Sequence, residues 1–274
     1  RWISRAYRNK TVNDQSLLLD ALWLLFASGY TMWLILGGLV WATTAIVAFV
    51  GFKLSLKLMQ KITSPSVQSG RGLTFLRVFS LGRRSEQLLE NVAKYWRHIG
   101  SVQMITGPDV ARSTVQPHQL LDFLSGDLAS HFVHDRASLI RSITEWDCEP
   151  DSDGRYRINS LFCHADTWQQ ALPQLAQVGD MVLMDLRSFS ATNAGCIHEI
   201  QHLVADVSLN NCLLIVDKTT DMPFLEGILQ QAWQCLPPYS PNKTRSPSET
   251  PIHQFDSSPH ALRQLVRQLC DAEA

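Results

Sequence analysis

The residues best suited to chemistry lie in one short run, 180–200. Cys196 and Glu199 stand three residues apart at the start of a predicted helix, and the turn before it carries the hydroxyls of Ser188 and Ser190. A carboxylate can stabilise an oxocarbenium-like centre or activate a nucleophile, and serine hydroxyls can bind ribose or phosphate. We therefore take Glu199 as the candidate catalytic residue and the serines as candidate ligand contacts.

The elements around this run predict where those side chains lie. Residues 181–186 are almost wholly apolar, which is typical of a central parallel strand covered on both faces. The small and hydroxyl residues that follow include Thr192 and Asn193, either of which can cap a helix over 193–207. An acid one turn into such a helix lies at the rim where open α/β sheets bind ligands. The alternative interpretation is that Glu199 merely favours the positive end of its helix.

Composition narrows the class of protein. The chain has 274 residues, 45% of them hydrophobic, which suffices for one sizeable domain and a membrane anchor. A formal net charge of -1, with no basic cluster interleaved with aromatics, argues against broad nucleic-acid binding. No phosphate-binding glycine loop, nucleophile elbow or Rossmann glycine run is present, so kinase, ATPase and serine-hydrolase functions are not indicated. Small molecules and proteins are the expected partners.

The cysteines indicate neither a disulfide framework nor a metal site. All six are scattered without a C-x-x-C pair, which favours free thiols in a reducing cytosol. Cys163 and His164 with Asp166 resemble a metal-binding fragment, but their spacing matches no zinc pattern. We therefore predict no metal ion.

The first part of the chain, 1–62, predicts a membrane anchor. Residues 17–59 carry few charges over roughly forty positions, about twice the length that one membrane-crossing helix needs. We predict two transmembrane helices, 17–36 and 39–59, with a turn at the two glycines between them. Basic residues flank both ends, which places the soluble domain in the cytoplasm and the anchor in the inner membrane. The alternative is a buried hairpin of a large soluble protein.

After a Ser-, Gly- and Pro-rich linker at 63–72, strand and helix patterns alternate through 73–274. The predicted fold class is α/β, with a five-stranded parallel sheet covered by helices on both faces. The expected strands are 73–80, 101–106, 181–186, 211–216 and 252–255, and the helices between them are 85–98, 167–178, 193–207, 223–235 and 259–272. An insertion at 107–165 is expected to hold helices at 116–133 and 136–146 and an extra strand or hairpin arm at 155–163.

Two stretches resemble TIR domains, flavodoxin-like signalling modules of which some cleave NAD. In that family a strand ends in a serine, and after a short loop a helix begins Trp-Cys-x-x-Glu. Here Ser188 or Ser190 and the run Cys196-Ile197-His198-Glu199 take those places, with Gly195 at the tryptophan position. The family's first strand ends Phe-Ile-Ser-Tyr-Ser before basic residues and an aspartate, and the matching run is 79–85, FSLGRRS. Ser80 matches, while Leu81 and Ser85 stand for the tyrosine and the aspartate.

The resemblance implies a bacterial-type, membrane-anchored signalling or defence effector that works as a homo-oligomer. It implies a nucleotide pocket in which NAD is substrate rather than cofactor, with Glu199 acting on its N-glycosidic bond. Nucleoside deoxyribosyltransferases, of related fold, also carry a glutamate early in a post-strand helix. The implied ligand contacts are Ser80, Gly82, Arg83, Asp109, Ser188, Ser190 and Cys196. The alternative is a catalytically inactive TIR-like adaptor or nucleotide sensor that acts through protein assembly.

Three further residues have mainly structural interpretations. Asp109 can reach the same rim or serve as a turn residue. Asp185, at a strand's carboxyl end, is expected to bond backbone amides of its own loop. His198 projects from a different helix face than Glu199 and is expected on the surface or in packing.

Overall fold

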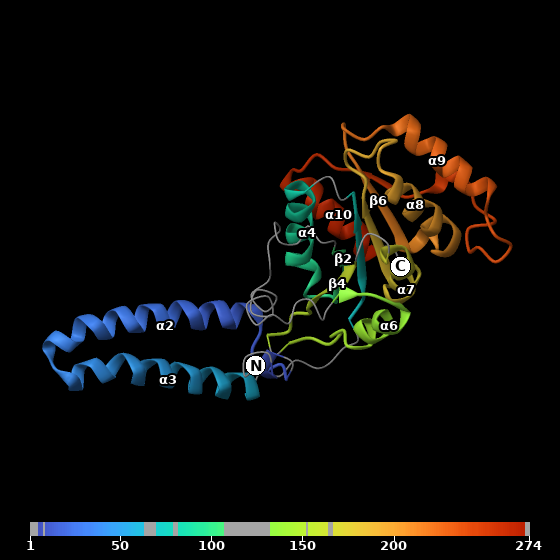
Figure 1. Cartoon of the computed structure of the whole chain (residues 1–274). Coiled ribbons are helices and arrows are strands. Elements are labelled where there is room, and N and C mark those ends of the chain that lie inside the picture. The colour runs from blue at the N-terminus through green and yellow to red at the C-terminus, as the bar shows by residue number, and fades with distance from the viewer. Residues whose placement is uncertain are drawn as a thin grey trace. The chain divides into compact units, whose positions relative to one another are not determined.

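The computed structural model describes residues 5–7, 9–62, 70–78, 82–106, 132–151, 153–163 and 167–271. The chain divides into two compact units, one that contains residues 1–68 and one that contains the β-sheet. Figure 1 shows the long helices of the first unit and the sheet with its covering helices in the second.

The first unit contains a helical hairpin. Helix α2 (Asp14–Leu34) leads through a single 3-10 turn (Ile35–Gly37) into α3 (Leu39–Ile62). Gly38 has a φ of 114°, a conformation that side chains with a Cβ rarely adopt, so a glycine suits this turn. The helices contact each other through the Trp23 and Phe52 rings, whose centroids are 5.4 Å apart, and through an ion pair. In that pair the ammonium group of Lys53 lies 2.6 Å from the Asp20 carboxylate.

Most large apolar side chains of the hairpin point outward. Residues Gln15–Gly37 form a helix long and apolar enough to cross a membrane, and none of it is buried. The apolar part of α3, Thr43–Leu56, is shorter than a crossing requires. Among the described residues, therefore, one N-terminal helix is apolar and long enough for a membrane anchor, a property it shares with signal sequences.

The second unit is built on a seven-stranded sheet with parallel pairing throughout, in the order β3-β4-β2-β1-β5-β6-β7. The strands are β1 (Leu73–Arg77), β2 (Val102–Thr106), β3 (Phe132–Val133), β4 (Ile158–Cys163), β5 (Met181–Asp185), β6 (Cys212–Val216) and β7 (Ile252–Gln254). The α/β class with a parallel sheet is confirmed, but the predicted number of five strands is wrong. The two additional strands, β3 and β4, come from the insertion at 107–165 and extend the sheet beyond β2, because β4 hydrogen-bonds along the edge that β2 would otherwise leave open.

The five expected strands keep an order of their own within the larger sheet, β2-β1-β5-β6-β7. The chain runs from β1 outward to β2, and later returns to the other side of β1 to form β5. The strand order therefore reverses between β1 and β5, whose last residues, Arg77 and Asp185, are aligned in the ladder. Loops that leave the sheet in opposite directions diverge at such a switch point.

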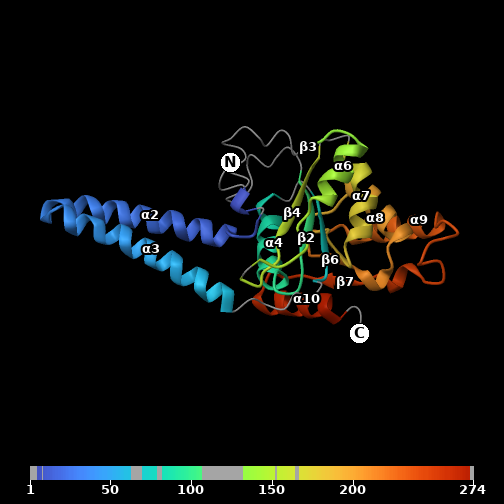
Figure 2. The same ribbon diagram turned by 90° about the horizontal axis from the view of Figure 1, so that it is seen from below.

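Helices cover both faces of the sheet, as Figure 2 shows. On one face α4 (Arg83–Trp96) and α10 (Pro259–Asp271) bury an apolar layer that includes Trp96 and Leu265. On the other face lie α7 (Trp168–Val178), α8 (Ala194–Asp206) and α9 (Met222–Gln234), together with α6 (Arg136–Thr144), which packs with α7. The sheet is thus buried on both sides, which explains the continuous apolar runs of its strands.

The insertion is described only in part. Residues 107–131 lie outside the described residues, and with them most of the predicted helix 116–133. The last two residues of that predicted helix, Phe132 and Val133, are a strand instead, because they pair with β4 at the edge of the sheet. Tertiary pairing has here overridden a helical sequence pattern.

Candidate functional site

Glu199 lies in the second turn of α8 and is almost fully buried, with 2% of its surface exposed. Its Oε2 atom is buried and has no hydrogen-bond partner in the structure described. Burial raises the pKa of Glu199 to about 8, and a hydrogen bond from the Cys196 thiol acts weakly in the opposite direction. Because a carboxyl group with this pKa keeps its proton at neutral pH, Glu199 is a neutral acid in the ligand-free protein.

Cys196 lies one turn before Glu199, against the end of β1. Its Sγ atom is 3.9 Å from the backbone oxygen of Arg77, the last residue of that strand. Burial raises the pKa of the Cys196 thiol, and its electrostatic and hydrogen-bond contacts with Glu199, together with the charge of Asp185, raise it further. Since the thiolate is the reactive form of cysteine, this thiol is not a nucleophile at neutral pH. It helps to hold α8 at the switch point.

Gly195, at the position of the family's tryptophan, lies beside an aromatic ring from another helix. A Cβ atom at Gly195 would lie 3.5 Å from the Cζ2 atom of Trp168 on α7. The same indole meets the His198 ring edge-on, with centroids 5.8 Å apart. His198 is exposed and packs against this ring, in keeping with the surface or packing role expected of it. An indole therefore lies next to the start of α8, although it is supplied from elsewhere in the sequence.

On the opposite face of the sheet, Asp185 at the end of β5 binds Arg187. The Nε and Nη2 atoms of Arg187 donate to the two carboxylate oxygens of Asp185, at 2.8 and 2.7 Å. Both side chains are buried, with exposed fractions of 0% and 3%. Asp185 also accepts the backbone N–H of Arg187 at 3.3 Å, which matches the bond to its own loop that the sequence suggested. The side-chain pair was not foreseen.

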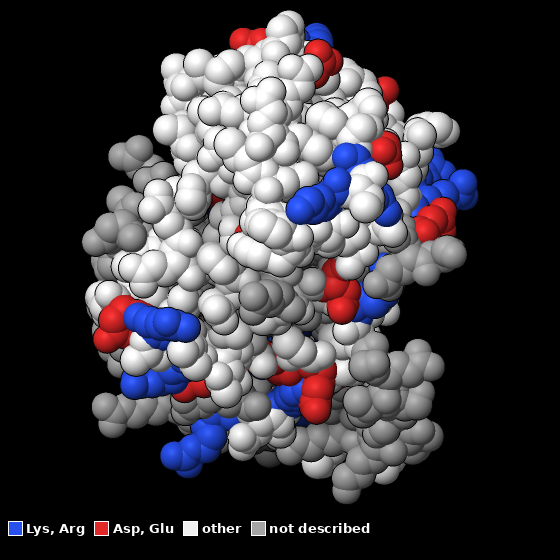
Figure 3. Space-filling view, turned by 90° about the vertical axis from the view of Figure 1, so that its right-hand side faces the viewer, with Lys and Arg blue, Asp and Glu red and all other residues white. Residues whose placement is uncertain are grey.

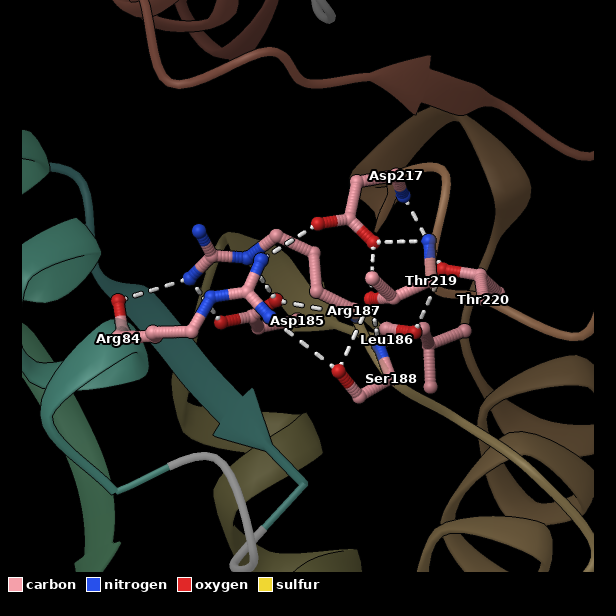
Figure 4. A network of polar contacts seen from close by, with 8 residues as sticks. All are labelled: Arg84, Asp185, Leu186, Arg187, Ser188, Asp217, Thr219 and Thr220. Carbon is pink, nitrogen blue, oxygen red and sulfur yellow. Dashed lines mark hydrogen bonds and ion pairs between the residues drawn. The ribbon is translucent and has the colours of Figure 1, made fainter.

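A second ion pair joins α4 to the loop after β6, as Figure 4 shows. The Nη2 atom of Arg84 donates to the Asp217 carboxylate at 2.7 Å, and its Nη1 atom donates to the Ser188 hydroxyl at 3.3 Å. The Ser188 backbone N–H donates to the Thr219 hydroxyl, which in turn donates to Asp217. Burial acts to raise the pKa of Asp217, but hydrogen bonds from Thr219 and from Arg84 outweigh it and hold the pKa below its ordinary value.

The backbone at Ser188 is unusual. Its φ is 58°, in the left-handed region that residues other than glycine rarely enter. This conformation is held by the contacts of Ser188 with Arg84 and Thr219. Strain of this kind persists where the surrounding structure determines it, and it often accompanies binding sites. Ser190, by contrast, uses its backbone N–H to bind the Asn193 side chain before α8 begins.

The predicted site residues that the structure describes do not gather in one place. Cys196 lies with Glu199 on the α8 face of the sheet, and Ser188 joins a polar network on the α4 face. Gly82 and Arg83 are exposed at the start of α4, where Gly82 has a φ of 49°. Ser80 and Asp109 lie outside the described residues. Both faces of the site border the carboxyl ends of β1 and β5.

Several residues of this site escaped the sequence analysis, namely Arg84, Trp168, Arg187, Asp217 and Thr219. A signal for two of them was present, because Asp217 and Thr219 directly follow an apolar strand predicted next to 181–186. The carboxyl ends of neighbouring parallel strands meet at one edge of a sheet, so polar residues there were candidates. Nothing in the spacing pointed to Trp168 or to the pairing of Arg84.

Neither the surface charge nor the arrangement of potential metal ligands points to a particular ligand. On the face of the molecule seen in Figure 3, Lys and Arg side chains lie in small scattered groups among Asp and Glu, with wide uncharged areas between them. Within the described part of the chain, no group of His, Cys, Asp and Glu is arranged to hold a metal ion.

A scan against protein-family models finds no match, and a search of curated proteins finds no similar sequence.

Proposed function

We propose that this protein is a membrane-anchored, TIR-like signalling or defence effector that binds a nucleotide and hydrolyses the N-glycosidic bond of NAD. The observation that carries this proposal is the buried carboxyl group of Glu199, which has an unpartnered oxygen and lies one helical turn after Cys196, whose thiol contacts the last residue of β1. A buried titratable group with a strongly raised pKa near a switch point is a candidate for catalysis on physical grounds. The order β2-β1-β5-β6-β7 is also that of flavodoxin-like sheets, to which TIR domains belong.

The raised pKa suits the proposed substrate. The nicotinamide ring of NAD carries a positive charge, and a positive charge near a carboxyl group favours its ionised form. Binding of NAD would thus convert Glu199 from a neutral acid into a carboxylate, which then stabilises the positive charge that develops on the ribose. Nicotinamide leaves as a neutral molecule without needing a proton, and the water molecule that adds to C1′ of the ribose gives up its proton to the carboxylate or to solvent, so a single carboxylate suffices. The indole of Trp168, beside Gly195, supplies an aromatic face near the same end of α8.

The anchor in this proposal is the hairpin of α2 and α3. The outward-facing apolar side chains of α2 suit a lipid bilayer, and the contact between Asp20 and Lys53 neutralises two charges that lipid would not solvate. We propose that both helices enter the inner membrane and that the sheet-containing unit lies in the cytoplasm, where NAD is found. Assembly of several copies would then bring their sheet-containing units together beneath the membrane.

The direct test is NAD turnover by the full chain in detergent micelles, followed by the release of nicotinamide. Glu199→Gln keeps the size of the side chain and removes its charge, and we expect it to reduce turnover by at least about a hundredfold. Glu226→Gln, on the exposed side of α9, is the matched control and should leave turnover unchanged. Wild-type protein that releases no nicotinamide, whether dilute or concentrated enough to assemble, would refute the hydrolase.

One observation favours the alternative of a catalytically inactive adaptor or nucleotide sensor. The charged groups at the carboxyl ends of β5 and β6 already pair with one another, Arg84 with Asp217 and Arg187 with Asp185. Glu199 is also closed off from solvent. A sensor would bind NAD or ADP without forming product, and its activity in cells would not change in Glu199→Gln. Binding measured by calorimetry together with nicotinamide release separates the two functions.

A further inference from the structure

Arg187 is a buried arginine whose guanidinium group is only partly used inside the protein. Its Nε atom binds Asp185, and its Nη2 atom binds both Asp185 and the backbone oxygen of Arg84, at 2.7 and 2.9 Å. Figure 4 shows no bond at the remaining nitrogen, Nη1. The two N–H donors of this nitrogen therefore have no partner among the residues drawn in Figure 4, although the arginine is held rigidly.

The guanidinium group of Arg84 lies in the same network. Its side chain is 47% exposed and is held by Asp217 and Ser188, which occupy one hydrogen on each of its terminal nitrogens. The donors that remain on Arg84 face no partner within the network drawn in Figure 4. The two arginines are tied together because Arg187 donates to the Arg84 backbone oxygen. Both therefore present unused donors at the carboxyl ends of β5 and β6.

We infer that Arg84 and Arg187 together bind a phosphate group at the carboxyl ends of β5 and β6. The inference deepens the proposed function and rests on it in one respect: the phosphate would belong to the pyrophosphate of the bound nucleotide. The planar fork of a guanidinium matches two phosphate oxygens, and the switch point between β1 and β5 is where open α/β sheets bind ligands.

Two features of the network favour this ligand. Asp185 and Asp217 hold the guanidinium groups in place before a ligand arrives, so binding loses little side-chain entropy. The two aspartates cancel the charges of the two arginines, so the net positive charge near these strand ends comes from exposed Arg83 and Lys218, their neighbours in sequence. The hydroxyls of Ser188 and Thr219, 2.9 Å apart, are further groups able to bind phosphate oxygens.

The experiment is calorimetric titration of the full chain in detergent micelles with inorganic pyrophosphate, ADP and adenosine. We expect pyrophosphate and ADP to bind and adenosine, which lacks phosphate, to bind far more weakly. Arg84→Gln should weaken the binding of pyrophosphate and of ADP about tenfold or more, the usual effect of losing a hydrogen bond to a charged group. Arg267→Gln removes one exposed positive charge from α10 and should change neither affinity.

Arg187 needs a variant that does not leave Asp185 as an unpaired buried charge. The double variant Asp185→Asn with Arg187→Gln keeps a neutral polar pair, and Arg187→Lys keeps the charge but loses the Nη1 donors. Both should weaken pyrophosphate binding about tenfold or more relative to wild type. If the double variant does not fold, as judged by near-UV circular dichroism, Arg187→Lys and Arg84→Gln decide the question.

The outcomes separate this inference from the proposed hydrolase. Pyrophosphate and ADP binding that depends on both arginines, in a protein that never cleaves NAD, supports the phosphate site and rejects the hydrolase. NAD cleavage with a Michaelis constant unchanged in Arg84→Gln and in Arg187→Lys overturns the phosphate site and leaves the hydrolase standing. The phosphate site is also overturned if wild-type protein binds neither pyrophosphate nor ADP. Tight binding of ADP with no binding of pyrophosphate overturns it as well, because the base and ribose would then account for the affinity.

Discussion

Asp185 and Arg187, two residues apart at the end of β5, form a buried ion pair with two hydrogen bonds of 2.8 and 2.7 Å. The same guanidinium donates to the Arg84 backbone oxygen at the start of α4 and lies over the Phe255 ring, 5.4 Å from its centroid. One side chain thus joins the end of β5, the start of α4 and the chain that follows β7. These are the segments that border one side of the candidate site.

Removing one member of this pair should destabilise the sheet-containing unit strongly. Arg187→Met leaves the Asp185 carboxylate buried without a partner, and we expect a loss of about 3 to 5 kcal/mol in the free energy of unfolding. Urea unfolding of the full chain in detergent, followed by near-UV circular dichroism, measures this loss. Arg267→Met, at an exposed position on α10, is the control and should cost less than about 0.5 kcal/mol. An unfolding midpoint for Arg187→Met equal to wild type would contradict the structural role of the pair.

Glu199 should make the protein less stable as the pH rises. Its folded pKa, about 8, lies above the ordinary value of 4.5, so the folded protein holds a proton that the unfolded chain releases. The free energy of unfolding should therefore be highest below the ordinary pKa, fall as the pH rises toward the folded pKa, and level off above it. The full effect is on the order of 5 kcal/mol. Glu199→Gln should abolish this dependence, and the difference between the two proteins across the pH range isolates it from other groups. A constant difference would contradict the burial of the carboxyl group.

The stabilising contribution of Asp217 should depend on pH in the opposite direction to that of Glu199. Its pKa is lowered in the folded protein, so its contribution is present above the ordinary value of 3.8 and is lost as the pH falls through the folded pKa. Thr219→Val removes the hydroxyl that donates to Asp217 and should cost about 1 kcal/mol at neutral pH. It should also move the acid-unfolding midpoint to higher pH. Thr219→Ser retains the hydroxyl and should behave like wild type, whereas equal midpoints for all three proteins would reject the role of this bond.

The contact between Asp20 and Lys53 should hold the helical hairpin together. Asp20→Leu or Lys53→Leu alone leaves one charge among apolar side chains, and we expect each to lower the amount of protein recovered in the membrane fraction. Exchanging the two residues, Asp20→Lys with Lys53→Asp, restores an ion pair and should restore the recovery. Recovery of the exchanged variant no better than that of the single variants would show that the pair does not stabilise the hairpin.

Much of the fold followed from local patterns. The apolar runs of β5 and β6 and the periodicity of α4 and α8 were recognisable in the sequence because parallel strands buried on both faces, and helices with one buried face, each impose a distinct spacing. The position of Glu199 after a strand also placed it near the switch point. Of the two additional strands, β4 lies within the extra strand or hairpin arm expected at 155–163, whereas β3 was missed because it is only two residues long and depends on pairing with β4.

The sequence by itself determined the alternation of strands and helices, the apolar N-terminal helix and the presence of one acid early in α8, because these depend on residues close together in the chain. Only the tertiary structure decided that Glu199 is buried with an unpartnered oxygen, that Trp168 lies beside Gly195, and that Arg84 pairs with Asp217. Arg84 and Asp217 are 133 residues apart, and they meet because the parallel sheet brings the ends of distant strands to one edge. The spacing of residues along a chain does not predict contacts between residues so far apart in the sequence.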